Sequence, residues 1–121
     1  MLKGTLYSIV SVTDLAGKII AELQLNKANE IFTGHFPGQP VLPGACMLQI
    51  LKEVLELALN KKIRLKRADQ MKFLSVVDPS VNDILQLTAG YSINGEDIVV
   101  NATMDTVNGA CFKFKGIFIN L

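Results

Sequence analysis

The 121-residue sequence lacks tryptophan and has only two tyrosines. A flat aromatic surface on which nucleic-acid bases could stack is therefore not expected. The sequence also lacks a charge bias, because twelve Lys and Arg side chains oppose eleven Asp and Glu side chains and leave a net charge of +1. This balance gives no overall attraction to nucleic acid, and we predict no nucleic-acid partner.

Cysteine and histidine are also scarce. The two cysteines, Cys46 and Cys111, are too few for a disulfide framework. One histidine and two distant cysteines cannot build a Cys/His zinc site within one chain. We therefore predict no metal and no other cofactor. Cysteines that are not arranged for pairing favour a reducing, cytoplasmic location.

Long apolar runs are missing too, since no stretch reaches the roughly 18 residues needed to cross a bilayer. The amino-terminal run MLKGTLYSIVSVTD is too short and too interrupted for a secretion signal. We predict no membrane partner. Apolar residues nevertheless make up 50% of the chain and charged residues 19%. This composition suits one folded core, and we predict a single domain over residues 1–121.

Apolar and polar residues alternate over several segments, which is typical of strands. The alternation is clearest in residues 18–25. Asn94-Gly95 and Asn108-Gly109 are strong signals for tight hairpins, so the last three strands should form an antiparallel meander. The predicted strands are 2–12, 18–25, 63–74, 84–93, 98–106 and 110–121.

One helix is predicted, over residues 45–60. Its polar residues form a single stripe at helical spacing, and the rest of it is apolar. Pro43 suits a helix start, because its missing N–H is not needed there. A helix this apolar must be largely covered, so the element order predicts an α+β fold in which a curved antiparallel sheet wraps one long helix. The stripe consists of Gln49, Lys52, Glu53, Glu56 and Asn60.

The segment before this helix, residues 26–44, carries the candidate chemistry. Its three prolines within seven residues exclude a helix or a central strand and restrict the loop. His35 is the only histidine in the chain, and imidazole is well suited to proton transfer near neutral pH. The Gly44 N–H, at the positive end of the helix, could stabilise charge on a carbonyl oxygen. A lone loop histidine is more often a simple hydrogen-bonding residue, and composition alone leaves both interpretations open.

The run GHFPGQPVLPG, residues 34–44, resembles the signature of the 3-hydroxyacyl-acyl-carrier-protein dehydratases of bacterial type II fatty-acid synthesis. Asn29-Glu30 before it and the helix after it fit the same pattern. The stretch 72–83, KFLSVVDPSVND, resembles the family's later strand and the turn before the meander. The resemblance covers roughly residues 8–121 and implies the hotdog fold, in which a sheet wraps one long helix.

The resemblance also implies a reaction. His35 would remove the Cα proton of a 3-hydroxyacyl thioester, the Gly44 N–H would polarise the thioester carbonyl, and loss of water would give the trans-2-enoyl thioester. Phe36 and Ala45 would join Gly44 in binding substrate. The partner would be an acyl carrier protein with a phosphopantetheine-linked acyl chain. The family's site lies between two subunits, which implies a homodimer or a higher homo-oligomer.

The sequence departs from this family pattern at two places. The family has Glu or Asp fourteen residues after the histidine, whereas this chain has Gln49, which can hydrogen-bond but cannot release a proton as an acid does. We therefore place Gln49 in the catalytic site as the weak point of the reaction. The chain also begins close to the first strand, whereas the family usually has a helix before it. We expect the surface under that helix to be open or differently closed.

Two nearby residues have alternative interpretations. Glu53, one turn after Gln49, is either a replacement acid or, more simply, a solvated or ion-paired helix residue. Cys46, in the first turn of the helix, is either a nucleophile with a lowered pKa or, more simply, a core residue.

Three functions remain open at this point. The chain could be a dehydratase, a weakly or non-catalytic subunit that pairs with a paralogue supplying the missing acid, or an acyl-thioesterase of the same fold, against which the dehydratase-type loop argues. A basic stretch could attract an acidic carrier protein or could simply be a solvated strand edge. Its members are Lys61, Lys62, Arg64, Lys66, Arg67 and Lys72.

Overall fold

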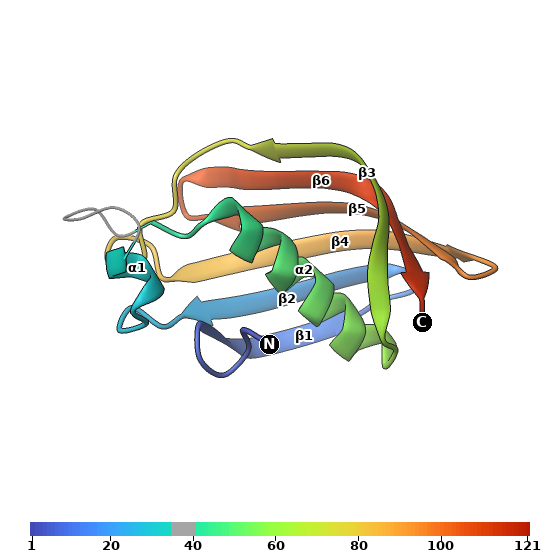
Figure 1. Ribbon diagram of the computed structural model, residues 1–121, viewed down its shortest axis with the longest axis horizontal. Coiled ribbons are helices and arrows are strands. Elements are labelled where there is room, and N and C mark those ends of the chain that lie inside the picture. Colours follow the sequence, from blue (N-terminus) through green and yellow to red (C-terminus); the bar gives the residue numbers. More distant parts are fainter. Residues whose placement is uncertain (35–40) are drawn as a thin grey trace.

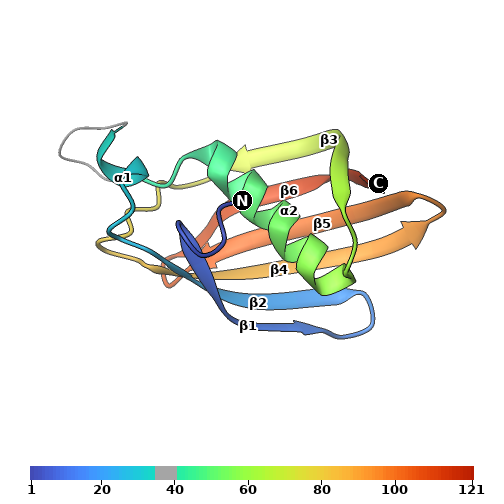
Figure 2. The ribbon, with the colours of Figure 1, turned by 60° about the horizontal axis from the view of Figure 1, so that its bottom comes forward.

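The computed structural model describes residues 1–34 and 41–121, and the side chains of residues 33 and 34 fall outside that description. One long helix lies across a face of a six-stranded antiparallel sheet (Figures 1 and 2). The elements are β1 (Tyr7–Asp14), β2 (Lys18–Leu25), α1 (Ile31–Gly34), α2 (Gly44–Leu59), β3 (Ile63–Phe73), β4 (Ile84–Asn94), β5 (Asp97–Thr106) and β6 (Gly109–Asn120). This architecture confirms the predicted α+β fold.

The strands lie in the order β1-β2-β4-β5-β6-β3, and every neighbouring pair is antiparallel. The predicted meander of the last three strands is confirmed. The helix begins at Gly44, one residue before its predicted start. The first strand begins at Tyr7 and not at residue 2, because residues 2–6 form a turn in which the Leu6 N–H donates to the Leu2 carbonyl at 2.8 Å. Gly4 takes the left-handed conformation that this turn needs (φ +93°).

The loop expected to be irregular contains a short helix, α1, which the prediction missed. The Asn29 side chain accepts a hydrogen bond from the Ile31 N–H at 2.9 Å, in the manner of a helix cap. Phe32 is buried beneath this turn. A single capped turn anchored by one aromatic residue carries too little periodicity to be seen in sequence.

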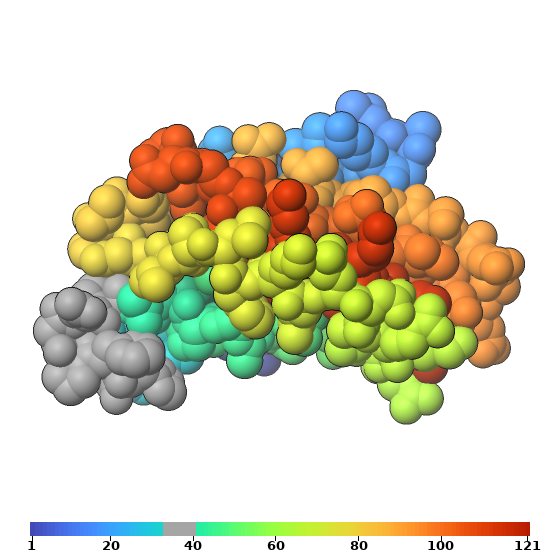
Figure 3. Space-filling view, turned by 90° about the horizontal axis from the view of Figure 1, so that it is seen from above, coloured from blue at the N-terminus to red at the C-terminus, as the bar shows by residue number. Residues whose placement is uncertain are grey.

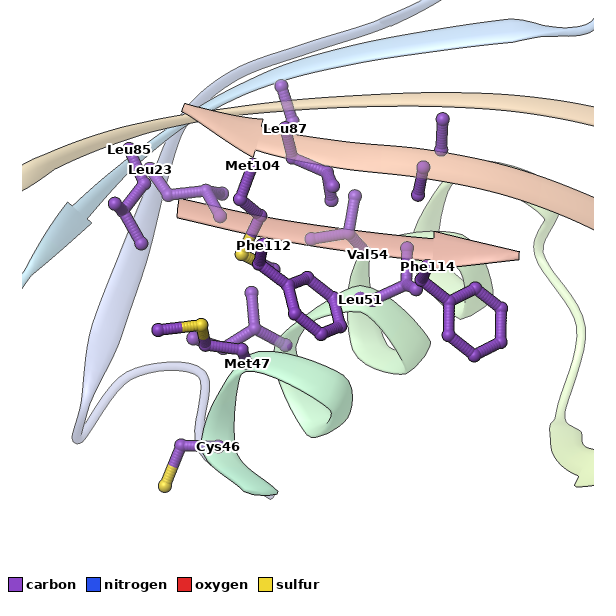
Figure 4. Close-up of a cluster of buried hydrophobic side chains, with 14 of the residues drawn as sticks. Leu23, Cys46, Met47, Leu51, Val54, Leu85, Leu87, Met104, Phe112 and Phe114 are labelled. Atoms are coloured by element: carbon purple, nitrogen blue, oxygen red, sulfur yellow. The ribbon is translucent and has the colours of Figure 1, made fainter. Parts of the chain in front are cut away.

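The core lies between α2 and the inner face of the sheet. Leu51 and Val54 on α2 are fully buried and face the labelled core side chains of the sheet, including Leu87 and Phe112 (Figure 4). Burial alternates along β2, β4 and β5, as expected for strands with one covered face. The core therefore holds the amino end of α2 at a fixed position against the sheet.

Strand β3 forms one edge of the sheet and runs along the molecular surface (Figure 3). Only Ile63 of its eleven residues is buried. Within the described chain β3 pairs with β6 alone, so the peptide groups on its other side face outward. An exposed edge of this length is available for pairing with another strand.

Candidate functional site

The amino end of α2 offers backbone N–H groups. Pro43 caps the helix in an extended conformation, and among the described residues no side chain caps this end. The Cys46 and Met47 N–H groups both donate to the Pro43 carbonyl, at 3.0 and 3.3 Å. The Gly44 N–H precedes them in the first turn, where amides have no carbonyl within the helix to bind. Together with the helix dipole, this makes Gly44 a suitable donor to a carbonyl oxygen that gains negative charge.

A cavity of about 510 Å³ adjoins this helix end. Its volume lies within the range of small-molecule sites. The lining side chains are mainly apolar, which suits an acyl chain or the arm that carries one. The lining residues are Val41, Leu42, Pro43, Gly44, Met47, Phe73, Ser75 and Val76.

The two walls of this cavity come from distant parts of the chain. Backbone hydrogen bonds hold them, because the Leu42 N–H donates to the Val77 carbonyl at 2.8 Å and the Leu74 N–H donates to the Cys111 carbonyl at 2.9 Å. The segment after β3 is thereby tied both to the residues before α2 and to the sheet. The cavity is thus part of the fold and does not depend on a single loose loop.

Gly44 is required by close packing. A Cβ atom at this position would lie only 2.7 Å from the Phe73 ring. That ring stacks on Phe112 with centroids 5.3 Å apart and is half exposed. The absence of a side chain at Gly44 therefore lets Phe73 approach the helix end and form the cavity wall.

The structure brings together only some of the predicted site residues. Gly44 lines the cavity, and Ala45 is exposed just beyond it. His35 and Phe36 lie outside the described residues. Gln49 does not line this cavity but lies farther along α2, on its polar stripe.

Sequence reasoning missed the opposite wall of the cavity, formed by Phe73, Ser75 and Val76. The family resemblance of residues 72–83 was a signal that could have found it. The resemblance identified this stretch as a strand and a turn, but it gave no indication that the stretch packs against the helix start.

Gln49 is half-buried and is held by Glu53. Its Nε2 donates to Oε2 of Glu53 at 2.8 Å. Glu53 is only 3% exposed and accepts three further hydrogen bonds, from the Leu2 N–H at 2.8 Å, the Lys3 N–H at 2.9 Å and the Tyr7 hydroxyl at 3.0 Å. Residues 1–7 therefore close over this part of α2, and both Figure 1 and Figure 2 show the amino terminus beside the helix.

This environment determines the charge of Glu53. Burial alone would raise the pKa of the carboxyl, but the hydrogen bonds from Leu2, Gln49, Lys3 and Tyr7 favour the charged form, and together they lower it. Burial, followed by the charge of Glu53, raises the pKa of Tyr7. Glu53 is therefore a buried carboxylate whose contacts favour its ionised form. The interpretation of Glu53 as a solvated or ion-paired surface group is wrong, and these contacts disfavour its role as a replacement acid.

Cys46 is a core residue, as the simpler interpretation predicted. It is 8% exposed, and burial raises the pKa of its thiol, so the reactive thiolate is disfavoured at neutral pH.

In the described parts of the chain, no three His, Cys, Asp or Glu side chains gather as a metal cluster would require. Among these described residues, no helix is long and apolar enough to span a membrane.

Comparison with known proteins places these features in a family. The model of the ApeI-like dehydratases (ApeI dehydratase) matches residues 11–110. The chain belongs to this ApeI-like dehydratase family, and the resemblance to the acyl-carrier-protein dehydratases is confirmed.

Curated relatives are named 3-hydroxyacyl-[acyl-carrier-protein] dehydratase FabZ. The protein from Acidovorax sp. (strain JS42) is 27% identical over 112 residues, covering 84% of this chain and 67% of the relative. The protein from Ralstonia nicotianae is 32% identical over 84 residues, covering 69% of this chain and 48% of the relative. The chain thus spans about half to two thirds of the length of these relatives.

Solved structures confirm the hotdog fold. The dehydratase heterocomplex ApeI:P from Xenorhabdus doucetiae matches with a TM-score of 0.72 and 20% identity, covering 90% of this chain and 95% of that chain. A hypothetical thioesterase with coenzyme A from Streptococcus pneumoniae matches with a TM-score of 0.67 and 11% identity, covering 95% and 85%. At these identities the likeness concerns the fold alone.

Proposed function

We propose that the chain is a dehydratase-type subunit that acts on 3-hydroxyacyl thioesters carried by acyl carrier protein. The observation that carries the proposal is the apolar cavity at the amino end of α2, into which the first turn of the helix brings Gly44. Membership of the ApeI-like dehydratase family and the names of the curated relatives support the reaction class.

Only a few groups of the chain take part in the proposed reaction. His35 takes the proton from Cα, and the electron pair moves toward the thioester carbonyl, whose oxygen gains negative charge. The Gly44 N–H stabilises this oxygen. His35 keeps the Cα proton; the bond between Cβ and oxygen then breaks, and the departing hydroxyl group leaves as water with a proton that an acid opposite His35 would supply. Phe36 and Ala45 belong to the substrate-binding part of the same proposal.

A second function, a partner subunit in a heteromeric dehydratase, is favoured by a specific observation. Gln49 cannot supply the proton for the departing hydroxyl, and the carboxylate one turn away, Glu53, is ionised and fully hydrogen-bonded. A related chain with an acid at the equivalent position would complete one of the two sites. A structural neighbour of this fold is named the dehydratase heterocomplex ApeI:P, and this supports the proposal of a heteromeric assembly.

The carrier protein would approach the basic side chains of β3, which project from the faces of the strand, while the strand's peptide edge remains available to a second chain. Within this strand Lys66 pairs with Asp97 at 3.0 Å and Arg67 with Asp69 at 2.6 Å, so part of the positive charge is already compensated. Arg64 and Lys72 are exposed and take no part in the ion pairs formed among the described residues. They are the better candidates for steering an acidic partner.

Turnover of 3-hydroxyacyl carrier-protein substrates, with and without a paralogue of this chain, tests the proposal. We expect enoyl thioester to form and His35→Ala to abolish its formation while the circular dichroism spectrum stays unchanged. Release of free thiol without enoyl product would indicate a thioesterase and contradict the dehydratase proposal. Unchanged turnover in His35→Ala would remove His35 from the mechanism. Activity that appears only with the paralogue would establish the heteromeric function.

A further inference from the structure

The polar side of α2 carries a hydrogen-bonding unit that the proposed reaction does not use. Oε1 of Glu53 accepts from the Lys3 N–H and the Tyr7 hydroxyl, and Oε2 accepts from the Leu2 N–H and Gln49 Nε2. Each carboxylate oxygen has about two acceptor positions. The carboxylate is therefore fully occupied, and three of its four donors come from the amino-terminal segment.

This unit fixes which end of the Gln49 amide faces Glu53. A side-chain amide can offer a neighbour either its NH₂ group or its carbonyl oxygen. An ionised carboxylate accepts hydrogen bonds only, so Glu53 selects the NH₂ group, at 2.8 Å. The carbonyl oxygen lies on the other arm of the planar amide and is directed away from Glu53.

We propose that Glu53 is a positioning residue that fixes the direction of the Gln49 amide, so that position 49 presents substrate with a hydrogen-bond acceptor that holds the 3-hydroxyl group. The inference rests on the proposed function together with the family resemblance, which places position 49 opposite His35 of another subunit, because Gln49 does not line the cavity of its own chain. A fixed acceptor binds a hydroxyl group, which can donate, and disfavours a 3-oxo group, which can only accept. Glu53 thereby makes the site selective for the 3-hydroxyacyl over the 3-oxoacyl thioester.

The substitution Glu53→Gln reverses this arrangement. If the new amide nitrogen takes the place of Oε2, the remaining oxygen still accepts from Lys3 and Tyr7, whereas the hydrogen bonds from the Leu2 N–H and from Gln49 Nε2 are both lost. The new nitrogen then faces Gln49, whose amide must turn over to accept from it. Position 49 would then present NH₂, a donor that a 3-oxo group can accept.

Binding of two analogues tests the inference. In both analogues an amide replaces the thioester of pantetheine, which suppresses elimination of water from the 3-hydroxy chain, and they differ only in carrying a 3-hydroxyoctanoyl or a 3-oxooctanoyl chain. We expect the wild-type protein to favour the 3-hydroxy analogue by about tenfold, because the 3-oxo group would leave an acceptor opposite an acceptor. In Glu53→Gln this preference should fall to near unity. Tyr7→Phe, the matched control, removes another donor to Glu53 without freeing Gln49 and should keep the wild-type ratio.

A measurement on the wild-type protein covers the case in which Glu53→Gln fails to fold. The side-chain amide signals of Gln49, recognised in a ¹⁵N NMR spectrum by their loss in Gln49→Glu, should shift as Glu53 takes up a proton at acid pH. Amide signals that do not respond to this titration would overturn the inference.

The binding outcomes separate the inference from the proposed function. A wild-type ratio retained in Glu53→Gln, or an equal loss of selectivity in Tyr7→Phe, refutes the positioning role. Equal binding of the 3-hydroxy and 3-oxo analogues leaves the proposed function standing and refutes the selectivity. Binding of neither analogue refutes the proposed function, and the inference falls with it.

Discussion

Gln49→Glu tests whether the missing acid limits the reaction. The substitution is nearly isosteric, so packing should change little. In the wild-type protein Gln49 Nε2 lies 2.8 Å from Oε2 of Glu53, whereas in the variant two carboxyl groups face each other. Two unit charges about 4 Å apart repel by about 4 kcal/mol at an effective dielectric constant of about 20. Both groups therefore cannot remain ionised at neutral pH.

The structure indicates which of the two carboxyls takes the proton. Glu53 keeps its donors from Leu2, Lys3 and Tyr7, which favour its charged form. The proton therefore resides at position 49, where the neighbouring charge raises the pKa of the new carboxyl. A positioned general acid contributes about 10²–10⁴-fold. We expect kcat for dehydration to rise by about 10²-fold. This is the lower end of that range, because the proton of the new carboxyl also hydrogen-bonds to Glu53.

The assay follows interconversion of a 3-hydroxyacyl and an enoyl thioester across neutral and alkaline pH. In Gln49→Glu, kcat should fall on the alkaline side as the proton leaves position 49. In the double variant Gln49→Glu with Glu53→Gln the neighbouring charge is absent, so this fall should begin at lower pH. If the wild-type protein is already fast and Gln49→Glu is slower, Gln49 is a working catalytic residue and the reasoning is wrong. If neither turns over, the partner-subunit function gains support.

Three further predictions follow from the described contacts. Because hydrogen bonds lower the pKa of Glu53, its contribution to the free energy of unfolding is present above the ordinary carboxyl pKa and is lost as pH falls. Glu53→Gln should therefore lower the free energy of unfolding by about 1–3 kcal/mol at neutral pH. Measured by urea unfolding, the stability of this variant should depend less on pH between about pH 5 and pH 2. Gly44→Ala should push the Phe73 ring into the cavity, so acyl binding measured by calorimetry should be lost while thermal unfolding shows a stability change within about 1 kcal/mol. The exposed edge of β3 and the segment that follows it, with Phe73, Leu74 and Val76 half to three-quarters exposed, should be covered by a second chain; a monomer at micromolar concentration in light scattering would contradict this.

The parts of the fold that sequence predicted are those set by local periodicity. The alternation in residues 18–25 gave the bounds of β2, and the polar stripe gave α2 to within one residue at each end. Asn94-Gly95 and Asn108-Gly109 marked the turns on either side of β5. Each of these signals depends on residues only a few positions apart, so one sequence is sufficient to find them.

The parts that sequence missed depend on contacts between distant residues. Glu53 meets the Leu2 N–H across 51 positions, and nothing in the local pattern distinguishes it from an exposed stripe residue such as Asn60. The cavity likewise joins Val41 and Leu42 to Phe73 and its neighbours. The motif identified one wall of the site, but only the packing of β3 against the helix start supplies the other.

The polar stripe of α2 also connects the chain's stability to its proposed activity. The stripe contains a carboxylate, but four hydrogen bonds hold it in the charged form, where it anchors residues 2, 3 and 7 on the helix. Protonating Glu53 to supply the reaction would weaken those bonds, so the same group cannot both fasten this segment and act as the acid. A homodimer would then carry Gln49 in both proposed sites and no proton donor at that position in either. In the proposed reaction, a related chain could supply the acid, and the buried carboxylate of Glu53 would then stay undisturbed. This is the physical reason why the sequence favours a heteromeric assembly.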